Sequence, residues 1–342
     1  MPPRVEPDAD IDLRTLSAEQ RELLTVQAAK AYYDLDQTMG DIAKRLGLTR
    51  WQVGRLLKEA REQGIVRIEI IPRAQRRPDL ESRLQRAYDL RDAVVVPHSG
   101  DPDARFSDAR FSDGSILDSV AQAAGQLIAA LHPRPSLIGV SWGRTMAAVA
   151  HWLPRPWNDG VEVVLLNGAM TLHSTAIRTN NIAELFALAG GGRATLLPVP
   201  AIVGRPETRE VLERDPVIAS VLALADAAEV ICFGLGGVTA DSVLVQSGYI
   251  DEADIARLRR SGAVGDVLGR FIGADGAIID PALDARTIGL DLALARGKPV
   301  SIGVAVGREK HAVVLAGLRA RLINVLVTDE QTALVALEAA HG

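Results

Sequence analysis

The sequence predicts an α/β protein with an N-terminal winged helix-turn-helix domain and a C-terminal domain built on a doubly wound parallel sheet. Three observations predict this fold class. A pattern of three helices around a tight turn precedes Gly64. Near-continuous apolar runs then alternate with amphipathic segments, as in parallel sheets that are covered on both faces. The length of 342 residues suits two domains.

The composition is that of a globular protein, with 48% hydrophobic, 24% charged and 4% aromatic residues. These values exclude wholesale disorder and collagen-like or coiled-coil structure. No apolar run approaches the roughly 20 residues of a membrane helix, and the acidic, proline-rich N-terminus is unlike a signal peptide. Cys232 is the single cysteine, and the six histidines lack metal-binding spacing. We therefore expect a soluble, cytoplasmic protein with no disulfide framework, metal, cofactor or membrane partner.

Capping and breaking residues define the first domain, expected over 16–72 after a disordered segment over 1–15. Ser17 and Thr49 are good N-caps, and Gly64 can end a helix. An alternating apolar run that follows resembles a short strand until Pro72 stops it. The expected elements are helices over about 17–36, 39–46 and 50–63 and a strand over 65–71.

Three residues within 39–60 carry the most specific pattern of the chain. Ala43 is small enough for two helices to cross closely, Gly47 tolerates a positive φ in the turn, and Val53 anchors the second helix. Their spacings of 4 and 6 residues match the DNA-binding helix-turn-helix. A helical hairpin without any role in DNA binding is the alternative.

Charge supports a polyanion partner for this domain. The whole chain has a formal net charge of −5, yet residues 38–61 carry six basic and two acidic side chains, and residues 73–91 carry six arginines and three acidic side chains. An ordinary solvated helix face would explain the charge alone equally well.

The outer face of the second helix supplies the candidate DNA contacts. Trp51, Gln52, Arg55, Lys58 and Glu59 are expected to face away from the small core, and the N-terminal end of this helix enters the major groove in the motif. Arginine can recognise guanine and glutamine can recognise adenine, whereas lysines more readily hold phosphates. The predicted DNA-binding residues are Lys44, Arg45, Thr49, Arg50, Trp51, Gln52, Arg55 and Lys58.

A charged linker over 73–80 separates this domain from the second, expected over 81–342. Short β-branched runs predict the strands of the parallel sheet there. These runs are 93–96, 136–140, 161–166, 194–199, 229–233, 299–306 and 323–327.

The turn after the strand over 136–140 is a candidate anion site. Ser141, Gly143, Arg144 and Thr145 lie between this strand and a helix that starts at once. Small and hydroxyl residues there expose backbone N–H groups beside the positive end of the helix, which favours phosphate. The pattern differs from the nucleotide-hydrolysing P-loop, and an ordinary glycine-rich turn is the alternative.

Three further features fall near strand ends. The turn with Gly236 fails the dinucleotide fingerprint, because Thr239 occupies the place of its last glycine. Asp266 is expected in a glycine-bounded loop. Lys310 opens the helix after the strand over 299–306, at the edge where open α/β sheets bind ligands, although a surface lysine is the alternative.

The order of several blocks resembles the SorC family of bacterial transcriptional regulators over roughly residues 20–340. After the helix-turn-helix come GVSWGRT (139–145), LNGA (166–169), TNNIAELFA (179–187), GLGG (234–237), GAVGDVLGRFIGADG (262–276), IGLDLA (288–293) and LINVLVTDEQTA (322–333). The resemblance implies an effector domain similar to sugar-phosphate isomerases and deaminases. It also implies a homo-oligomer, dimeric or tetrameric, that a phosphorylated sugar or polyol releases from operator DNA or resets on it.

The resemblance also assigns the effector pocket. The turn residues Ser141 to Thr145 would hold phosphate, and Asn167 and Arg178 depart from family patterns, since relatives often have a basic residue and a neutral amide there. This departure favours a monophosphorylated effector over a bisphosphate. The predicted effector-binding residues are Ser141, Gly143, Arg144, Thr145, Asn167, Arg178, Gly236, Asp266 and Lys310.

An isomerase- or deaminase-like enzyme with an appended helical domain is the alternative function. Such enzymes need a positioned acid/base pair near the phosphate. The catalytic loop of the DGADE type and its paired lysine are absent, since GLGGVTADS stands nearby. We therefore expect a DNA-binding regulator of carbohydrate catabolism rather than an enzyme.

Overall fold

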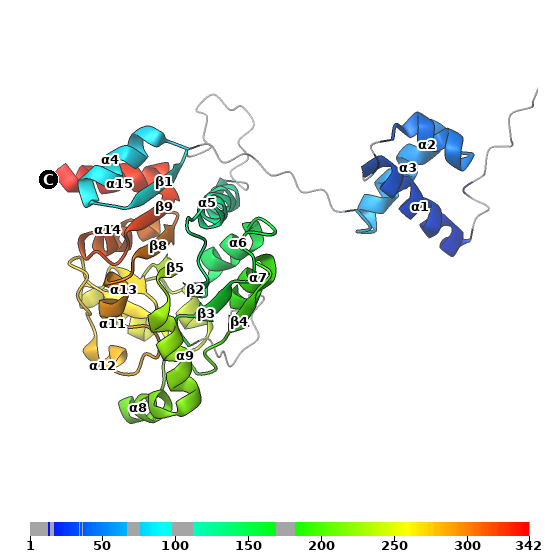
Figure 1. Ribbon diagram of the computed structural model, residues 1–342. Coiled ribbons are helices and arrows are strands. Elements are labelled where there is room, and N and C mark those ends of the chain that lie inside the picture. The colour runs from blue at the N-terminus through cyan, green and yellow to red at the C-terminus, as the bar shows by residue number, and fades with distance from the viewer. Residues whose placement is uncertain are drawn as a thin grey trace, which may run out of the picture. The chain divides into compact units, whose positions relative to one another are not determined.

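The computed structural model describes residues 13, 17–33, 35, 37–66, 76–97, 112–168 and 182–341. The chain divides into two compact units, Met1–Pro72 and Arg73–Gly342, which we call the head and the body (Figure 1). The division falls where the sequence predicts the end of the first domain. Apart from Leu13, which is buried, the segment predicted to be disordered lies outside the described residues.

The described residues of the head form three helices, α1 (Ala18–Tyr33), α2 (Met39–Leu46) and α3 (Arg50–Glu62). Gly47 ends α2 with φ 64°, a left-handed conformation that suits glycine. The backbone N–H of Leu48 returns to the carbonyl of Ala43 at 2.9 Å and closes the turn. The predicted helix-turn-helix is therefore present. Of the predicted strand, Ile65 and Val66 lie in a bend and 67–71 lie outside the described residues.

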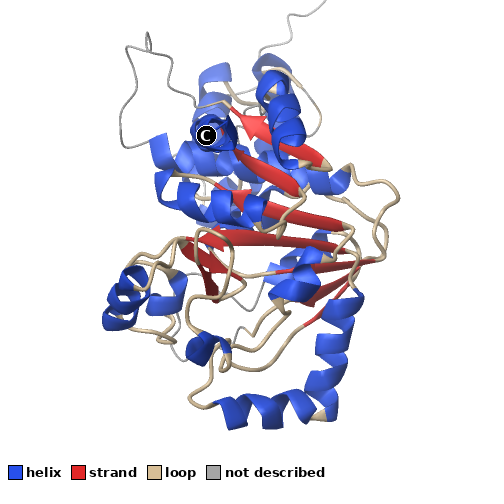
Figure 2. Cartoon of the chain, turned by 90° about the vertical axis from the view of Figure 1, so that its left-hand side faces the viewer, coloured by secondary structure: helices blue, strands red, loops and turns tan. Residues whose placement is uncertain are grey.

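In the described part of the body, seven parallel strands form the sheet, flanked by helices on both sides (Figure 2). Their order is β1-β9-β8-β5-β2-β3-β4. The strands are β1 (Asp92–Val96), β2 (Leu137–Val140), β3 (Glu162–Leu165), β4 (Arg193–Thr195), β5 (Val230–Gly236), β8 (Val300–Ala305) and β9 (Val325–Asp329). All seven runs that the sequence singled out thus contribute a strand.

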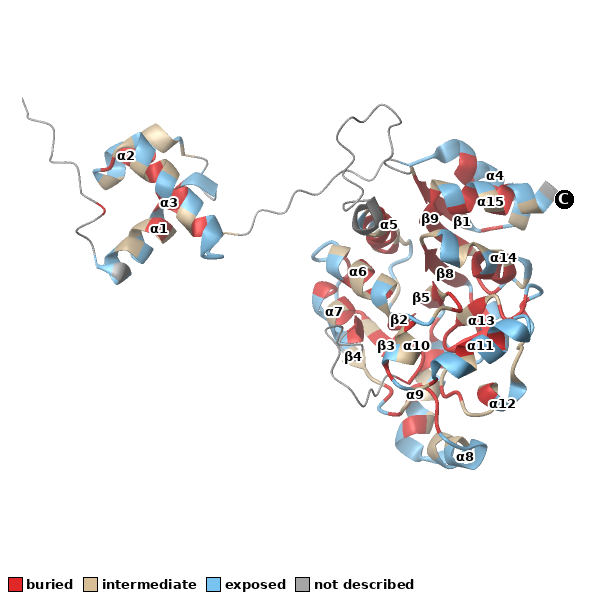
Figure 3. Ribbon diagram, turned by 180° about the vertical axis from the view of Figure 1, so that it is seen from behind, coloured by how far each residue is buried: buried red, intermediate tan, exposed pale blue. Residues whose placement is uncertain are grey.

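Helices connect and cover these strands, and buried side chains concentrate where they meet the sheet (Figure 3). They are α4 (Pro78–Tyr88), α5 (Ser112–Ala129), α6 (Arg144–Trp152), α7 (Ile182–Ala189), α8 (Pro206–Arg214), α9 (Pro216–Ala227), α10 (Val243–Gln246), α11 (Glu252–Arg260), α12 (Pro281–Asp284), α13 (Leu292–Arg296), α14 (His311–Arg319) and α15 (Glu330–His341), with a 3₁₀ turn, η3 (Arg308–Lys310).

Three local expectations differ from the structure. Strand β4 stops at Thr195 rather than 199, because its ladder with β3 ends at the pair of Val164 with Thr195. Helix α4 already starts at Pro78, a favourable first helical residue, and buried Leu80 makes the end of the predicted linker part of the body. Asp266 lies on a strand rather than in a loop. Two short strands, β6 (Gly265–Val267) and β7 (Arg270–Ile272), form a hairpin whose first strand pairs antiparallel with the end of β5.

Candidate functional site

A pocket of about 640 Å³ lies at the carboxyl edge of the parallel sheet, where the strand order reverses. Strand β2 pairs with β3 on one side and with β5 on the other. After β2 the chain continues to one side of this strand, through β3 and β4, and then returns to its other side as β5. Ligands of open α/β sheets bind at such a switch point. The pocket walls come from the ends of β2, β5, β8 and β9 and from β6.

The pocket brings together eight of the nine predicted effector residues. Those eight are Ser141, Gly143, Arg144, Thr145, Asn167, Gly236, Asp266 and Lys310. The ninth, Arg178, lies outside the described residues. Segments from 141 to 310 thus meet at one edge because the carboxyl ends of parallel strands share it.

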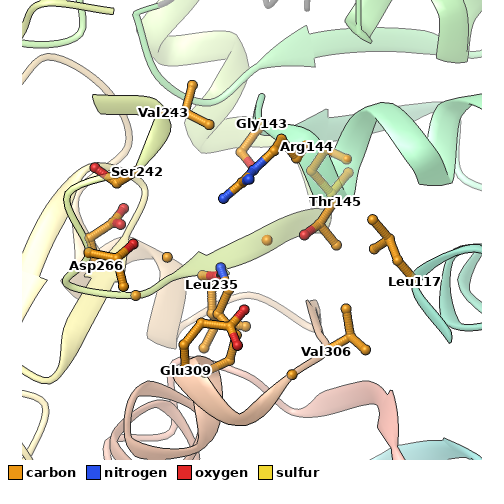
Figure 4. A pocket seen from close by; sticks show the side chains of 18 of the residues that line it. Leu117, Gly143, Arg144, Thr145, Leu235, Ser242, Val243, Asp266, Val306 and Glu309 are labelled. Atoms are coloured by element: carbon orange, nitrogen blue, oxygen red, sulfur yellow. Dashed lines mark hydrogen bonds between the residues drawn. The ribbon is translucent and has the colours of Figure 1, made fainter. Parts of the chain in front are cut away.

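The turn after β2 places the start of α6 at the pocket. Gly143 is the N-cap with φ 127°, a conformation that a residue with a Cβ rarely adopts, and no side chain caps the helix. Arg144 and Thr145 project toward the cavity from the first turn of α6 (Figure 4). Uncapped N–H groups, a guanidinium and a hydroxyl form an arrangement that favours an anion.

Two buried polar atoms in the pocket wall lack a hydrogen-bond partner among the described residues. They are Oγ of Ser141 and Oδ1 of Asn167. Buried polar side-chain atoms are usually satisfied, so such an orphan needs an explanation. Both residues line the cavity, and polar groups of a bound ligand would supply the missing partners.

Asp266 and Lys310 form the charged end of the pocket opposite α6. The Asp266 carboxylate packs so closely on Gly236 that a Cβ there would lie 1.7 Å from Oδ1. Nζ of Lys310 donates to the carbonyl of Leu235. Loss of hydration lowers the pKa of Lys310 and raises the pKa of Asp266, and their mutual attraction opposes both shifts. Replacing water by a ligand anion would favour the charged lysine.

Several lining residues escaped sequence analysis. Asp329 ends β9, and its Oδ2 accepts hydrogen bonds from the backbone of Gly307 at 3.1 Å and from the hydroxyl of Thr332 at 2.7 Å. Its position at the end of a predicted strand was a usable signal. Asp241, which pairs with Arg144 at 3.4 Å, lies in the loop between β5 and α10, five residues after the strand ends.

The predicted DNA-binding residues gather on α2 and α3. Six of the eight are exposed: Lys44, Arg45, Arg50, Trp51, Arg55 and Lys58. Thr49 and Gln52 are half-buried and cap α3 reciprocally, with the backbone of Thr49 donating to Oε1 of Gln52 at 2.7 Å. Glu59 does not face solvent as expected. Its side chain is 16% exposed and pairs with Arg21 of α1.

Two negative findings concern the described residues. In the ranges given above, no three histidine, cysteine, aspartate or glutamate side chains are arranged to hold a metal ion. Within the same ranges, no helix has the length and hydropathy needed to cross a membrane.

Comparison with known proteins identifies the family. A family model described as "Putative sugar-binding domain" matches residues 73–338. The deoxyribonucleoside regulator of Bacillus subtilis (strain 168) is 31% identical over 314 residues, which cover 92% of this chain and 97% of that one. The full-length sorbitol operon regulator SorC of Klebsiella pneumoniae has the same fold, with a TM-score of 0.67, 27% identity and coverage of 94% of this chain and 100% of that one.

The chain belongs to the SorC family of transcriptional regulators. Another relative, the erythritol catabolism regulatory protein EryD of Brucella abortus (strain 2308), is 29% identical over 92% of this chain and 96% of its own. A sugar-binding regulator domain from Arthrobacter aurescens TC1 is 30% identical, with a TM-score of 0.65 and coverage of 76% of this chain and 97% of that one. These SorC relatives are regulators, not enzymes, so the predicted family, the α/β fold class with its parallel sheet and the non-enzymatic nature are confirmed.

Proposed function

We propose that this SorC-family regulator binds operator DNA through α2 and α3 of the head and that a phosphorylated sugar or polyol in the body pocket controls this binding. Relatives named for sorbitol, erythritol and deoxyribonucleosides support a carbohydrate effector. A regulator that acts on DNA and responds to metabolites would work in the cytoplasm.

One observation carries the choice of a phosphorylated effector. The uncapped start of α6 and the half-buried Lys310 face the same cavity, which also holds the unsatisfied Ser141 and Asn167 side chains. The cations favour a phosphate, and the two neutral atoms suit hydroxyl groups. The negative charge of Asp266 near Lys310 would repel a second phosphate, which favours a monophosphate. The volume is within the range of small-ligand sites.

Operator binding requires more than one copy of the chain. A single helix-turn-helix contacts only a few base pairs, and paired heads bind half-sites about 34 Å apart. We therefore propose a homodimer or a homotetramer as the active species. Effector binding would then change which arrangement of the heads the body favours.

A route from the pocket toward the head begins at the carboxyl end of β9. Asp329 lines the pocket, and the next residue, Glu330, pairs with Arg77. The backbone N–H of Arg77 also donates to the carbonyl of Val95 at 2.9 Å, which fixes the first part of the body after the linker. An effector that shifts Asp329 would thus move the point where the linker enters the body.

A thermal-shift screen of the full chain tests the effector class. The screen would compare sugar and polyol monophosphates with their unphosphorylated forms. We expect only the monophosphates to raise the melting temperature, because a ligand at 100 times its dissociation constant adds about 2.7 kcal/mol to stability. Thr145→Val should abolish the shift without changing DNA affinity. Equal shifts from phosphorylated and unphosphorylated forms would contradict the proposal.

A further inference from the structure

Four side chains in the head form a continuous ordered row on α3 and across to α1. Trp51, Arg55 and Glu59 follow one another at four-residue spacing, which places them on one face of the helix. Helices α1 and α3 pack together (Figure 1). The Arg21 side chain of α1 contacts Glu59 at the end of the row.

Glu59 is the anchor of the row. Its carboxylate accepts two hydrogen bonds from Arg21, at 2.9 Å from Nε and 2.5 Å from Nη2, in the forked geometry that makes such pairs strong. This pairing holds the pKa of Glu59 below its usual range. A carboxylate on a helix that faces DNA would normally repel the phosphates. Here the charge of Arg21 offsets that of Glu59, so the cost of keeping it is small.

Arg55 is held between two fixed groups. Its Nε donates to Oε1 of Glu59 at 3.2 Å, and its guanidinium carbon lies 5.8 Å from the centre of the Trp51 ring. An arginine side chain free in solution loses considerable rotamer entropy when it binds. Glu59 and Trp51 reduce that loss in advance. Because the bond to Glu59 uses Nε, the edge formed by the two Nη atoms is the one that can reach a base.

Trp51 is the most exposed large hydrophobic side chain among the described residues, at 71%. It stands in the first turn of α3, the part of the recognition helix that contacts base edges. Apolar side chains there pack on the C5 methyl group of thymine. An indole that also stacks on Arg55 would contact a base pair next to the one that Arg55 contacts.

We propose that Glu59 is a positioning residue that fixes Arg55 for bidentate contact with a guanine, and that Trp51 contacts the methyl group of an adjacent thymine. The inference rests on the proposed DNA binding and deepens it, since it names the bases. Each operator half-site should then contain a guanine next to a thymine.

The proposal gives Glu59→Gln an unusual signature. The variant loses the anchor of Arg55 but leaves Arg21 and Arg55 as uncompensated cations. It should therefore bind random duplexes more tightly, on the order of two- to fivefold, while losing base preference. A purely structural role for Glu59 would weaken binding to all duplexes alike.

The test is selection from a library of random duplexes by the full-length chain, followed by sequencing. Wild type should prefer guanine over other bases at one half-site position by about 10- to 100-fold. Glu59→Gln and Arg55→Lys, which keeps the charge but loses the fork, should both lose this preference. Glu62→Gln is the matched control. It removes the same charge from the same helix at a side chain that pairs with Lys58 instead, and should keep the preference.

A second arm tests Trp51 with the selected duplex. Replacing the thymine by deoxyuridine removes only the methyl group, and wild type should then bind about three- to fivefold more weakly. Trp51→Ala should not distinguish the two duplexes. Equal affinity of wild type for both would overturn the role of Trp51.

The outcomes separate this inference from the proposed function. A selected sequence whose guanine survives in Glu59→Gln, or is lost equally in Glu62→Gln, overturns the role of Glu59 alone. Should Glu59→Gln fail to fold, Arg55→Lys retains the pair between α1 and α3. A guanine preference that survives in Arg55→Lys overturns the bidentate contact for which Glu59 positions Arg55. If wild type selects no sequence at all, DNA binding itself is refuted.

Discussion

The head and the body present cations in opposite settings. In the head, the candidate DNA contacts lie on and between α2 and α3, and six of the eight are exposed. In the body, Lys310 is half-buried in a concave pocket beside Asp266 and a helix N-terminus. Exposed charges suit a long polyanion that is held by many weak contacts, whereas a small anion needs few contacts from which water is excluded. The same residue type therefore serves two kinds of recognition.

Salt should produce the largest difference between the two regions. Two heads that each place Lys44, Arg45 and Lys58 on phosphates make six such contacts. Raising the salt concentration from 50 to 200 mM should then weaken operator binding by about 10³-fold. Effector affinity should change by less than about fivefold, since the pocket is less screened. Fluorescence anisotropy and calorimetry measure the two affinities, and parallel salt dependences would remove the distinction.

Lys310→Ala and Lys58→Ala should each impair one binding activity, effector binding by the body or DNA binding by the head, and leave the other unchanged. Lys310→Ala should weaken effector binding by about 10- to 100-fold, because a hydrogen bond to a charged group is lost, and leave operator affinity unchanged. Lys58→Ala should weaken binding to all duplexes alike and leave effector binding unchanged. Each variant is the control for the other in the same two assays. Unchanged effector affinity in Lys310→Ala would show that the pocket is wrongly placed.

The protonation of Lys310 should make effector binding depend on pH. Its pKa is lowered by loss of hydration, so it loses its proton below its ordinary value of 10.5. As the pH rises, the neutral Lys310 amine becomes the favoured form in the free protein, because the buried charge is costly. Anion binding, however, needs the charged amine. Effector affinity should thus fall as the pH rises toward 10.5, while the phosphate stays a dianion. Calorimetry on Lys310→Ala, which should show no such fall, is the control.

The ion pair between Glu330 and Arg77 should couple effector binding in the body to operator binding by the head. Glu330→Gln should leave operator and effector affinities intact but reduce the effect of effector on operator binding by about two- to tenfold. Glu162 of β3 forms a comparable ion pair with Arg193 of β4, and neither residue lines the pocket. Glu162→Gln removes this pair and should preserve the full response. A full response in Glu330→Gln would exclude this route.

Sequence predicted the parts of both regions that depend on local chemistry. The pattern of Ala43, Gly47 and Val53 identified the head motif, because a tight turn requires those residue types nearby in the chain. The turn at Gly143 was identified because it directly follows a strand. Contacts between distant segments were missed. The pairing of Gly236 with Asp266 and of Arg21 with Glu59 joins residues about 30 and 38 positions apart, which no local pattern encodes.

The head and the body should also differ modestly in how far a lost helix cap lowers their unfolding midpoints. Each unit contains a capping box in which this can be compared. Thr49 caps α3 in the head and Asp251 caps α11 in the body, each reciprocally with the third helical residue. Replacing either cap by alanine should cost about 1 kcal/mol. Because the head has a much smaller core, Thr49→Ala should lower its unfolding midpoint by about 4–8 °C, whereas Asp251→Ala should lower that of the body by about 2–4 °C. Differential scanning calorimetry resolves the two transitions if the cores unfold independently. A single transition that both substitutions shift equally would mean that the head and the body unfold together. The difference between the two units would then be limited to how they bind anions and would not include their stability.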